Sequence, residues 1–279
     1  MNVNVHMNVG PYIENVGTHI EVRQVDKCFP VQGGQVVALK QIDLSIGRGE
    51  FVCLLGPSGC GKSTLLNAIA GFSAPTAGRI TVDGRGITGP GPDRGMVFQE
   101  YALFPWMTVA HNIAFGLEIK GLRRREIDPR VAELLAMLNL TEFRDRFPKD
   151  LSGGMRQRVA IARILALDSP VMLMDEPFGA LDALTRRSLQ DELLRIWTAT
   201  RKTIVFVTHS IEESIYLADR IVVLTYRPGT IKRDLRVELP RPRDSATPAF
   251  NDLKRELSLL VMEEHHRHEA VEMAGLTTD

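Results

Sequence analysis

A glycine-rich segment near the first quarter of the chain has the residue types of a phosphate-binding loop. It fits the pattern G-x-x-x-x-G-K-[ST] and consists of Gly56, Pro57, Ser58, Gly59, Cys60, Gly61, Lys62, Ser63 and Thr64. Its glycines let the backbone turn so that successive N–H groups point at phosphate oxygens. We expect Lys62 to place an ammonium group at the outer phosphates and Ser63 to supply a hydroxyl ligand for Mg²⁺.

Two adjacent carboxylates end an apolar segment in the second half of the chain. Asp175 and Glu176 follow the run Val171–Met174, which has the length and composition of a buried strand. Neighbouring side chains at a strand end point in different directions, so the two can take different roles. We expect Asp175 to hold Mg²⁺ and Glu176 to orient or deprotonate an attacking water. Without the phosphate loop, a solvated acidic turn before Pro177 would be an equally good interpretation.

A third segment could bind phosphate at the start of a helix. Leu151 is followed by Ser152, Gly153 and Gly154, after which apolar residues recur at helical spacing to Leu165. Ser152 is a good N-cap, and the glycines allow a ligand to approach the free N–H groups of the first turn. Taken alone, this segment is better interpreted as an ordinary capped helix.

These residues must be positioned by alternating strands and helices. The pattern predicts strands at 19–25, 41–46, 51–55, 77–82, 95–98, 171–174, 203–207 and 220–224. It predicts helices at 62–70, 183–197, 211–218 and near 250–264, with a helical insertion at about 101–163. Strands that alternate with helices indicate an α/β fold with a mostly parallel sheet covered on both faces. We expect residues 1–17 to be a flexible extension and 241–279 to be a helical and flexible tail.

The composition is that of an ordinary soluble protein. Of the 279 residues, 44% are apolar and 24% are charged, and Lys plus Arg equals Asp plus Glu at 34 each. The zero formal charge removes the simplest argument for nucleic-acid binding. No apolar run approaches the roughly 20 residues that cross a bilayer. Three cysteines at unrelated spacings favour reduced thiols over a disulfide framework, with Cys60 a small filler of the loop.

Together, the three segments resemble the nucleotide-binding subunit of an ATP-binding cassette (ABC) transporter over roughly residues 18–240. Further positions match that family: Gln99 fits its glutamine loop, Asp182 its D-loop and His209 its switch histidine. Phe29 stands where the family places an aromatic ring on adenine, although that signature is weaker. The resemblance implies a P-loop NTPase (ABC ATPase) core with a mostly parallel sheet, an antiparallel β subdomain and a helical subdomain at about 101–163.

The resemblance also implies how the site works. ATP and Mg²⁺ are the expected cofactors, with the metal at Ser63, Gln99 and Asp175. Glu176, His209 and Gln99 are the expected catalytic residues. Two copies are expected to face head to tail, so that each ATP lies between one phosphate loop and the partner's Ser152, Gly153 and Gly154, with Asp182 contributing.

A finer resemblance involves segments 89–106 and 175–186, which are similar to those of importers of nitrate, taurine and aliphatic sulfonates. It implies an ATPase on the cytoplasmic face of the plasma membrane that works with an integral-membrane permease. An extracytoplasmic solute-binding protein would act indirectly, and no nucleic acid would bind. Phe104, Pro105 and Trp106 would contribute to a groove for a short permease helix, although Phe104 and Trp106 could also be core residues.

Three alternatives remain at this point. The solute could be a different small molecule, such as a vitamin precursor. A soluble ABC ATPase of DNA repair would carry a long heptad-patterned arm, and one of translation would carry two cassettes in one chain. A small-molecule kinase shares the phosphate loop but needs neither the segment at 151–154 nor His209. His265, His266 and His268 are more typical of a solvated tail than of a metal site.

Overall fold

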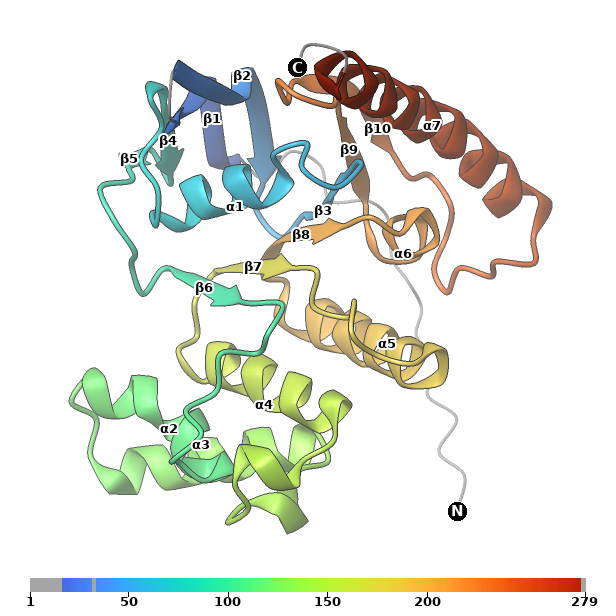
Figure 1. The fold of residues 1–279 in the computed structure, drawn as a ribbon. Coiled ribbons are helices and arrows are strands. Elements are labelled where there is room, and N and C mark those ends of the chain that lie inside the picture. Colours follow the sequence, from blue (N-terminus) through green and yellow to red (C-terminus); the bar gives the residue numbers. More distant parts are fainter. Residues whose placement is uncertain (1–16, 32–33, 277–279) are drawn as a thin grey trace.

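The protein contains two β-sheets and a separate group of helices (Figure 1). The structure, a computed structural model, describes residues 17–31 and 34–276. The strands are β1 Thr18–Val31, β2 Gly34–Gly47, β3 Phe51–Leu55, β4 Ala77–Val82, β5 Arg85–Gly86, β6 Arg94–Val97, β7 Val171–Asp175, β8 Thr203–Thr208, β9 Arg220–Leu224 and β10 Ile231–Arg236. The helices are α1 Lys62–Ala70, α2 Val109–Ile119, α3 Arg124–Met137, α4 Gly153–Ala166, α5 Ala183–Thr200, α6 Ile211–Leu217 and α7 Pro248–Leu276, with short 3₁₀ turns at Thr141–Phe143 and Pro148–Asp150.

The larger sheet has the order β10-β9-β3-β8-β7-β6. Its strands from β9 to β6 run parallel, and β10 pairs antiparallel with β9 at one edge. Strand β3 lies between β9 and β8, and all five of its residues are buried. The carboxyl ends of parallel strands lie at one edge of the sheet, which brings together the segments that follow β3, β6, β7 and β8.

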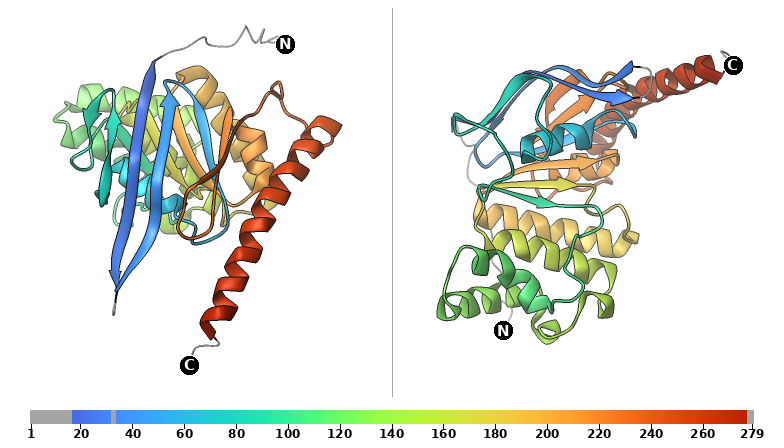
Figure 2. Two further views of the ribbon diagram at one scale, coloured as in Figure 1. Left: turned by 90° about the horizontal axis from the view of Figure 1, so that it is seen from above. Right: turned by 60° about the vertical axis from the view of Figure 1, so that its left-hand side comes forward.

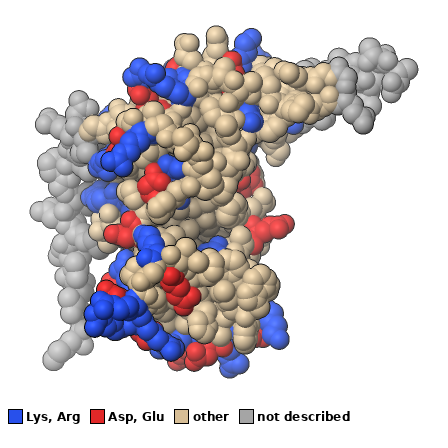
Figure 3. Space-filling view, turned by 90° about the vertical axis from the view of Figure 1, so that its left-hand side faces the viewer, with Lys and Arg blue, Asp and Glu red and all other residues tan. Residues whose placement is uncertain are grey.

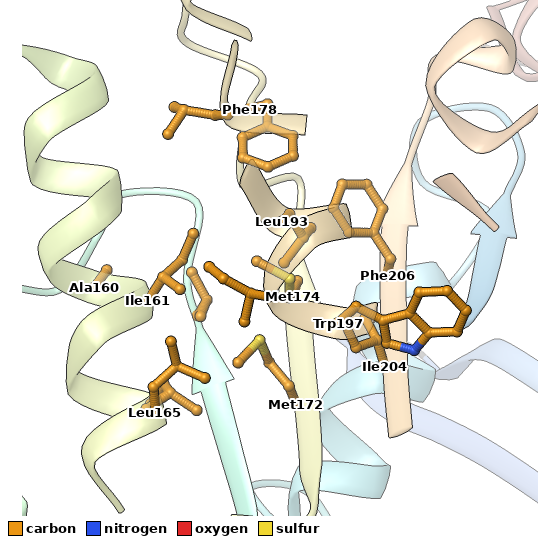
Figure 4. Packing of buried hydrophobic residues seen from close by; sticks show 14 of the residues in the cluster. Ala160, Ile161, Leu165, Met172, Met174, Phe178, Leu193, Trp197, Ile204 and Phe206 are labelled. Atoms are coloured by element: carbon orange, nitrogen blue, oxygen red, sulfur yellow. The ribbon is translucent and has the colours of Figure 1, made fainter. Parts of the chain in front are cut away.

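The two faces of this sheet belong to two different hydrophobic cores. Because side chains alternate along a strand, Val52 and Leu54 pack in the core that contains α1. Phe51, Cys53 and Leu55 pack in the other core, which contains α4 and α5. Figure 4 shows this second core: Ala160, Ile161 and Leu165 of α4 lie against Met172 and Met174 of β7, beside Leu193 and Trp197 of α5. Helices α1 and α4 therefore cover opposite faces of the sheet.

The smaller sheet is antiparallel, with the order β2-β1-β4-β5. Its two longest strands, β1 and β2, lie side by side and extend beyond the α/β core (Figure 2). The sequence predicted only the inner parts of these strands, at 19–25 and 41–46. The strands continue because Lys27–Val31 pairs with Gly34–Leu39 across the hairpin. Since this outer part is largely exposed, it lacks the alternation of a half-buried strand.

The helical group is formed by α2, α3 and the adjacent α4, which pack against one another at one end of the molecule. Residues 101–108 were expected to be helical but are not part of a helix. The first helix of this group is α2, which begins at Val109 after the N-cap Thr108. Helix α3 begins at Arg124 and has Pro129 inside it. The Glu126 carboxylate accepts a hydrogen bond from the Arg123 N–H. This bond caps the helix and fixes its start at Arg124.

Two elements near the carboxyl end differ from the expectation. Strand β10 was not predicted, because Lys232, Arg233, Asp234 and Arg236 give it the charged composition of a sheet edge. Helix α7 is 29 residues long and exceeds the expected segment at 250–264 at both ends. It runs along the outside of the molecule beside β10 (Figure 2). The expected flexible extension falls almost entirely on residues 1–16, outside the described residues.

The surface carries charges of both signs, as the equal numbers of acids and bases require. On the face in Figure 3 they are interspersed, and basic side chains gather at the lower edge, at the helical end of the molecule. Among the described residues, no helix combines the length and the apolar character needed to span a bilayer. Nor do three His, Cys, Asp or Glu side chains of the described part converge as a metal cluster would require.

Candidate active site

The phosphate loop connects the centre of the parallel sheet to the start of α1. It leaves the buried strand β3 and enters the helix at Gly61, the N-cap residue, whose φ of 101° is unfavourable for any residue with a Cβ. Gly61 is also crowded, since an added Cβ would lie 2.9 Å from the Ala38 carbonyl oxygen. The first turn of α1 therefore presents its free N–H groups at the sheet edge, where a helix N-terminus favours an anion.

Lys62 lies on the inside of this loop. Its side chain is 5% exposed, and Nζ donates to the carbonyl oxygens of Gly56 and Pro57, each at 2.8 Å. Cys60 is fully buried beside it, and burial raises the pKa of its thiol. A buried ammonium group within the loop provides the positive charge that a polyphosphate needs. The raised pKa supports the interpretation of Cys60 as an unreactive filler.

Ser63 and Asp175 come together from α1 and β7. The Ser63 hydroxyl donates to Asp175 Oδ1 over 2.8 Å, although 112 residues separate the two in the chain. Burial raises the pKa of the Asp175 carboxyl, and the neighbouring Glu176 acts in the same direction. A hydroxyl and a carboxylate at this separation are two oxygen ligands of the kind that Mg²⁺ prefers. These residues fit a magnesium site beside the phosphate loop.

Glu176 and His209 lie at the ends of the adjacent strands β7 and β8. His209 Nδ1 is 3.0 Å from Glu176 Oε2, and the histidine side chain is 58% exposed. Glu176 has φ of +42°, which is unfavourable for a residue with a side chain, and its N–H donates to the Val207 carbonyl. A non-glycine residue held in this conformation is often found at a functional site.

A buried network holds the segment around His209, and the sequence analysis did not identify it. Glu213 of α6 accepts hydrogen bonds from Thr208 Oγ1 and from Gln190 Nε2. Burial raises the pKa of Glu213, which is 6% exposed. Thr208 Oγ1 also accepts from the Ser210 N–H, so the residues on both sides of His209 are fixed. The feature of the sequence that could have indicated this network is Glu213, which stands four residues after His209 on an otherwise apolar helix face.

Gln99 follows β6 in an exposed turn at the same edge of the sheet. Two residues further along the chain, Tyr101 and Ala102 have positive φ values of 63° and 46°. Arg163 of α4 donates to both of their carbonyl oxygens, at 3.3 and 2.7 Å. The chain after Gln99 is thereby attached to the helical group.

Ser152 begins α4 as its N-cap, and its hydroxyl accepts the Met155 N–H at 3.3 Å. Gly154 cannot be replaced without a clash, since an added Cβ would lie 2.6 Å from Thr185 Cγ2 of α5. Helices α4 and α1 pack on opposite faces of the sheet, so the sheet lies between the helix that Ser152 begins and the helix that the phosphate loop begins. The structure therefore does not unite these two predicted phosphate-binding segments within one chain.

Asp182 is the N-cap residue of α5. Its Oδ1 accepts the Thr185 N–H at 3.0 Å, and this hydrogen bond lowers the pKa of its carboxyl. The capping role explains an aspartate here without any ligand. Its side chain is exposed, as is Leu184 in the next turn, so this corner of the molecule presents both polar and apolar contacts to its surroundings.

Phe29 lies on β1 beside a cavity of about 440 Å³. Its ring is 40% exposed, with the Lys27 ammonium 5.1 Å from the ring centre. The other lining residues are Thr64, Asn67, Phe72, Ser73 and Phe98. Since Thr64 belongs to the phosphate loop and its helix, an aromatic surface lies within reach of that loop. Such a surface suits the flat face of a purine base.

Comparison with known proteins identifies close relatives. The family model described as ABC transporter matches residues 39–179. The nitrate import ATP-binding protein NrtD of Synechocystis is 48% identical over 85% of this chain and 90% of its own. The aliphatic sulfonates import ATP-binding protein SsuB of Bacillus cereus is 44% identical over 85% of this chain and 94% of its own. The dimeric post-hydrolysis structure of the ATP-binding cassette MJ0796 with ADP and Pi has a TM-score of 0.70 and 33% identity, covering 79% of this chain and all of that one.

Proposed function

The chain belongs to the ABC transporter family and is an ATPase, and from this premise we propose that it powers the import of a small anionic solute through a separate permease. In this proposal residues 18–240 form the nucleotide-binding domain, with the helical subdomain at about 101–163. Residues 1–17 and 241–279 are its terminal extensions. The protein would act at the cytoplasmic face of the plasma membrane as a peripheral subunit.

One observation carries the proposal that two copies act together. Helices α4 and α1, which begin at Ser152 and at the phosphate loop, lie on opposite faces of one sheet, and the first turn of each helix has N–H groups suited to phosphate. A head-to-tail pair would place each terminus over the partner's loop, with Ser152, Gly153 and Gly154 facing the outer phosphate. Asp182, which stands beside exposed Leu184, would lie at the same contact. The dimeric cassette with ADP and Pi described above supports this arrangement.

The chemical roles follow from the contacts at the sheet edge. Lys62 and the loop N–H groups would bind the phosphates, and Ser63, Asp175 and Gln99 would hold Mg²⁺. The metal would neutralise charge on the phosphate oxygens. Glu176 would take the proton of the attacking water, and His209 would fix the direction of its carboxylate through the 3.0 Å contact. Phe29 would stack on adenine.

A permease contact is supported by exposed aromatic residues after Gln99. The Trp106 side chain is 70% exposed, and Phe104 packs on it with ring centres 5.7 Å apart. Arg163, which holds the chain at 101–102, also lies over the Phe104 ring. Large exposed apolar side chains of this kind are typical of protein contacts. A movement of the Gln99 turn would therefore displace a short permease helix docked here.

The solute would be nitrate, an aliphatic sulfonate or taurine. The named functions of the nitrate and sulfonate relatives support a small anion, while their similar identities to this chain leave the choice among such anions open. Recognition would lie in the permease and in an extracytoplasmic solute-binding protein. Another small solute, such as a vitamin precursor, is the second candidate, and a soluble non-transport ATPase is the third.

The deciding experiment reconstitutes this chain with the permease that co-purifies with it and with a solute-binding protein. ATP hydrolysis is measured with nitrate, taurine, an alkanesulfonate and a thiamine precursor. We expect nitrate or one of the two sulfonates, taurine and the alkanesulfonate, to stimulate hydrolysis and to accumulate in vesicles. Stimulation by the uncharged or cationic solute alone would overturn the anion proposal. Full hydrolysis with no permease interaction would instead favour the soluble ATPase.

A further inference from the structure

The turn between β9 and β10 packs against the outside of the phosphate loop. Arg227 Nε donates to the Gly59 carbonyl oxygen over 3.1 Å. At Gly229 a Cβ would lie 2.3 Å from the Cys60 carbonyl oxygen, so the turn approaches the loop as closely as a backbone can. The Gly59 carbonyl and the Cys60 N–H belong to one planar peptide unit. The Cys60 N–H donates to the Pro57 carbonyl oxygen at 3.4 Å, so the Arg227 contact and this bond within the loop together fix the peptide unit.

This turn is rigid and is also attached to β2. The Thr225 hydroxyl donates to the Pro228 carbonyl at 2.9 Å and accepts the Thr230 N–H at 2.8 Å. The Gly229 N–H donates to Ala38, and the Lys40 N–H donates to the Gly229 carbonyl, both at 2.9 Å. A displacement at one end of the turn would thus be transmitted to its contact with the loop rather than absorbed within it.

Helix α7 reaches the same turn through a buried carboxylate. Glu264 is fully buried, and its Oε2 accepts the Tyr226 N–H at 2.9 Å. Its Oε1 accepts from Lys232 Nζ at 2.7 Å and from Arg267 Nη1 at 3.1 Å. A buried carboxylate is tolerated because donors of this kind surround it. Tyr226 immediately precedes Arg227. Two hydrogen bonds therefore connect α7 to the phosphate loop, one from the Tyr226 N–H to Glu264 and one from Arg227 to the Gly59 carbonyl.

We propose that Glu264 is a positioning residue for the phosphate loop, and that α7 controls nucleotide affinity through it. The carboxylate fixes the Tyr226 backbone, which places the Arg227 guanidinium on Gly59 and orders the loop before ATP arrives. A loop ordered in advance loses less conformational entropy when it binds. The proposal rests on the assignment of residues 56–64 as the phosphate loop. It makes α7 a point at which a partner could alter ATP binding.

The test compares Glu264→Ala with Glu263→Ala in the full chain. Glu263 is the neighbouring exposed residue of α7, and it also pairs with Lys232, whereas Glu264 alone of the two accepts the Tyr226 N–H of the turn. We expect Glu264→Ala to weaken ATP binding and raise KM on the order of tenfold, the effect of one charge-assisted hydrogen bond, with kcat at saturation changed less than about twofold. Glu263→Ala should bind as the unaltered protein does. Glu264→Gln, which keeps an acceptor for Tyr226, should recover most of the affinity.

Further variants separate this relay from a general loss of stability. Arg227→Ala leaves the contacts of Glu264 intact and should weaken binding by a similar factor without lowering Tm. The double variant Arg227→Ala with Glu264→Ala should be no weaker than either single one, because both break the same connection. Normal affinity in Arg227→Ala, or additive losses, would overturn the relay. If Lys62→Ala also bound ATP normally, the phosphate-loop assignment itself would fail.

Discussion

His209 Nδ1 and Glu176 Oε2 are 3.0 Å apart, across a chain separation of 33 residues. Each residue immediately follows the last residue of its strand, and β7 and β8 are adjacent and parallel. Two side chains beyond the carboxyl ends of such neighbours must lie close together. The positive φ of Glu176 turns its carboxylate out of the strand direction, to where it meets the imidazole. The pair is therefore built by the sheet and not by a flexible loop.

Replacing Glu176 by Gln should abolish hydrolysis while ATP still binds. The amide keeps the shape of the side chain but cannot accept a proton, so the rate should fall by about 10²–10⁴-fold. Since ATP is not consumed, the two-copy complex should persist and be visible by size-exclusion chromatography with ATP. Glu212→Gln, on the exposed side of α6, serves as the control. Undiminished turnover in Glu176→Gln would exclude the role in water activation.

Replacing His209 by Ala should slow hydrolysis through Glu176. The carboxylate would lose the imidazole contact and its fixed direction, and kcat should fall at least tenfold with little change in the affinity for ATP. Because the two residues act as one unit, the variant lacking both should be no slower than Glu176→Gln alone. Losses that multiply in the double variant would argue for independent roles.

Ser152 should act on ATP held by the partner copy. Helix α4, which Ser152 begins, and helix α1, which follows the phosphate loop, cover opposite faces of the sheet in one chain. We expect Ser152→Ala to reduce hydrolysis while isolated subunits bind ATP normally. In mixed dimers of Ser152→Ala with Lys62→Ala chains, one composite site carries both defects and the other neither, so about half of the activity should return. If no activity returned, both residues would serve the same chain's site.

Phe29 should contribute to affinity for the base and not to the chemical step. The loss of a stacked ring in Phe29→Ala should raise KM for ATP about threefold to tenfold, with kcat unchanged. Phe29→Tyr should retain the affinity, because the aromatic face is kept. Phe72→Ala, which alters the same cavity from the α1 side, makes an informative comparison. A lower kcat with an unchanged KM would contradict the stacking role.

Glu213 should make stability depend on pH. Burial raises its pKa above the usual 4.5, so the folded protein holds a proton that the unfolded chain releases. The stabilising effect of that proton is complete below pH 4.5 and is lost as the pH rises through the raised folded-state pKa. Glu213→Gln remains neutral throughout. Its Tm should equal that of the unaltered protein near pH 4.5 and exceed it near pH 8, as measured by thermal scans over that range. A constant difference at all pH values would exclude this linkage.

The sequence predicted much of the core because buried elements carry strong periodic patterns. Strand 51–55, helix 62–70 and strand 220–224 are confirmed at both ends by the structure. Each is bounded by glycine, by a charged residue or by a turn, and each has a continuous or periodic apolar face. The exposed elements were less visible. Strand β10 and the outer hairpin of β1 and β2 bury few side chains, so no pattern marks them.

The sequence alone therefore determined which residues we expect to meet phosphate, metal and water, because those chemistries require particular side chains at fixed short spacings. The tertiary structure decided which residues lie next to one another although they are far apart in the sequence. It placed Ser63 beside Asp175 and His209 beside Glu176, and it put α4, which Ser152 begins, on the face of the sheet opposite α1. It also brought Glu264 to the turn behind Gly59. Such contacts depend on strand order and helix packing, which local periodicity does not encode.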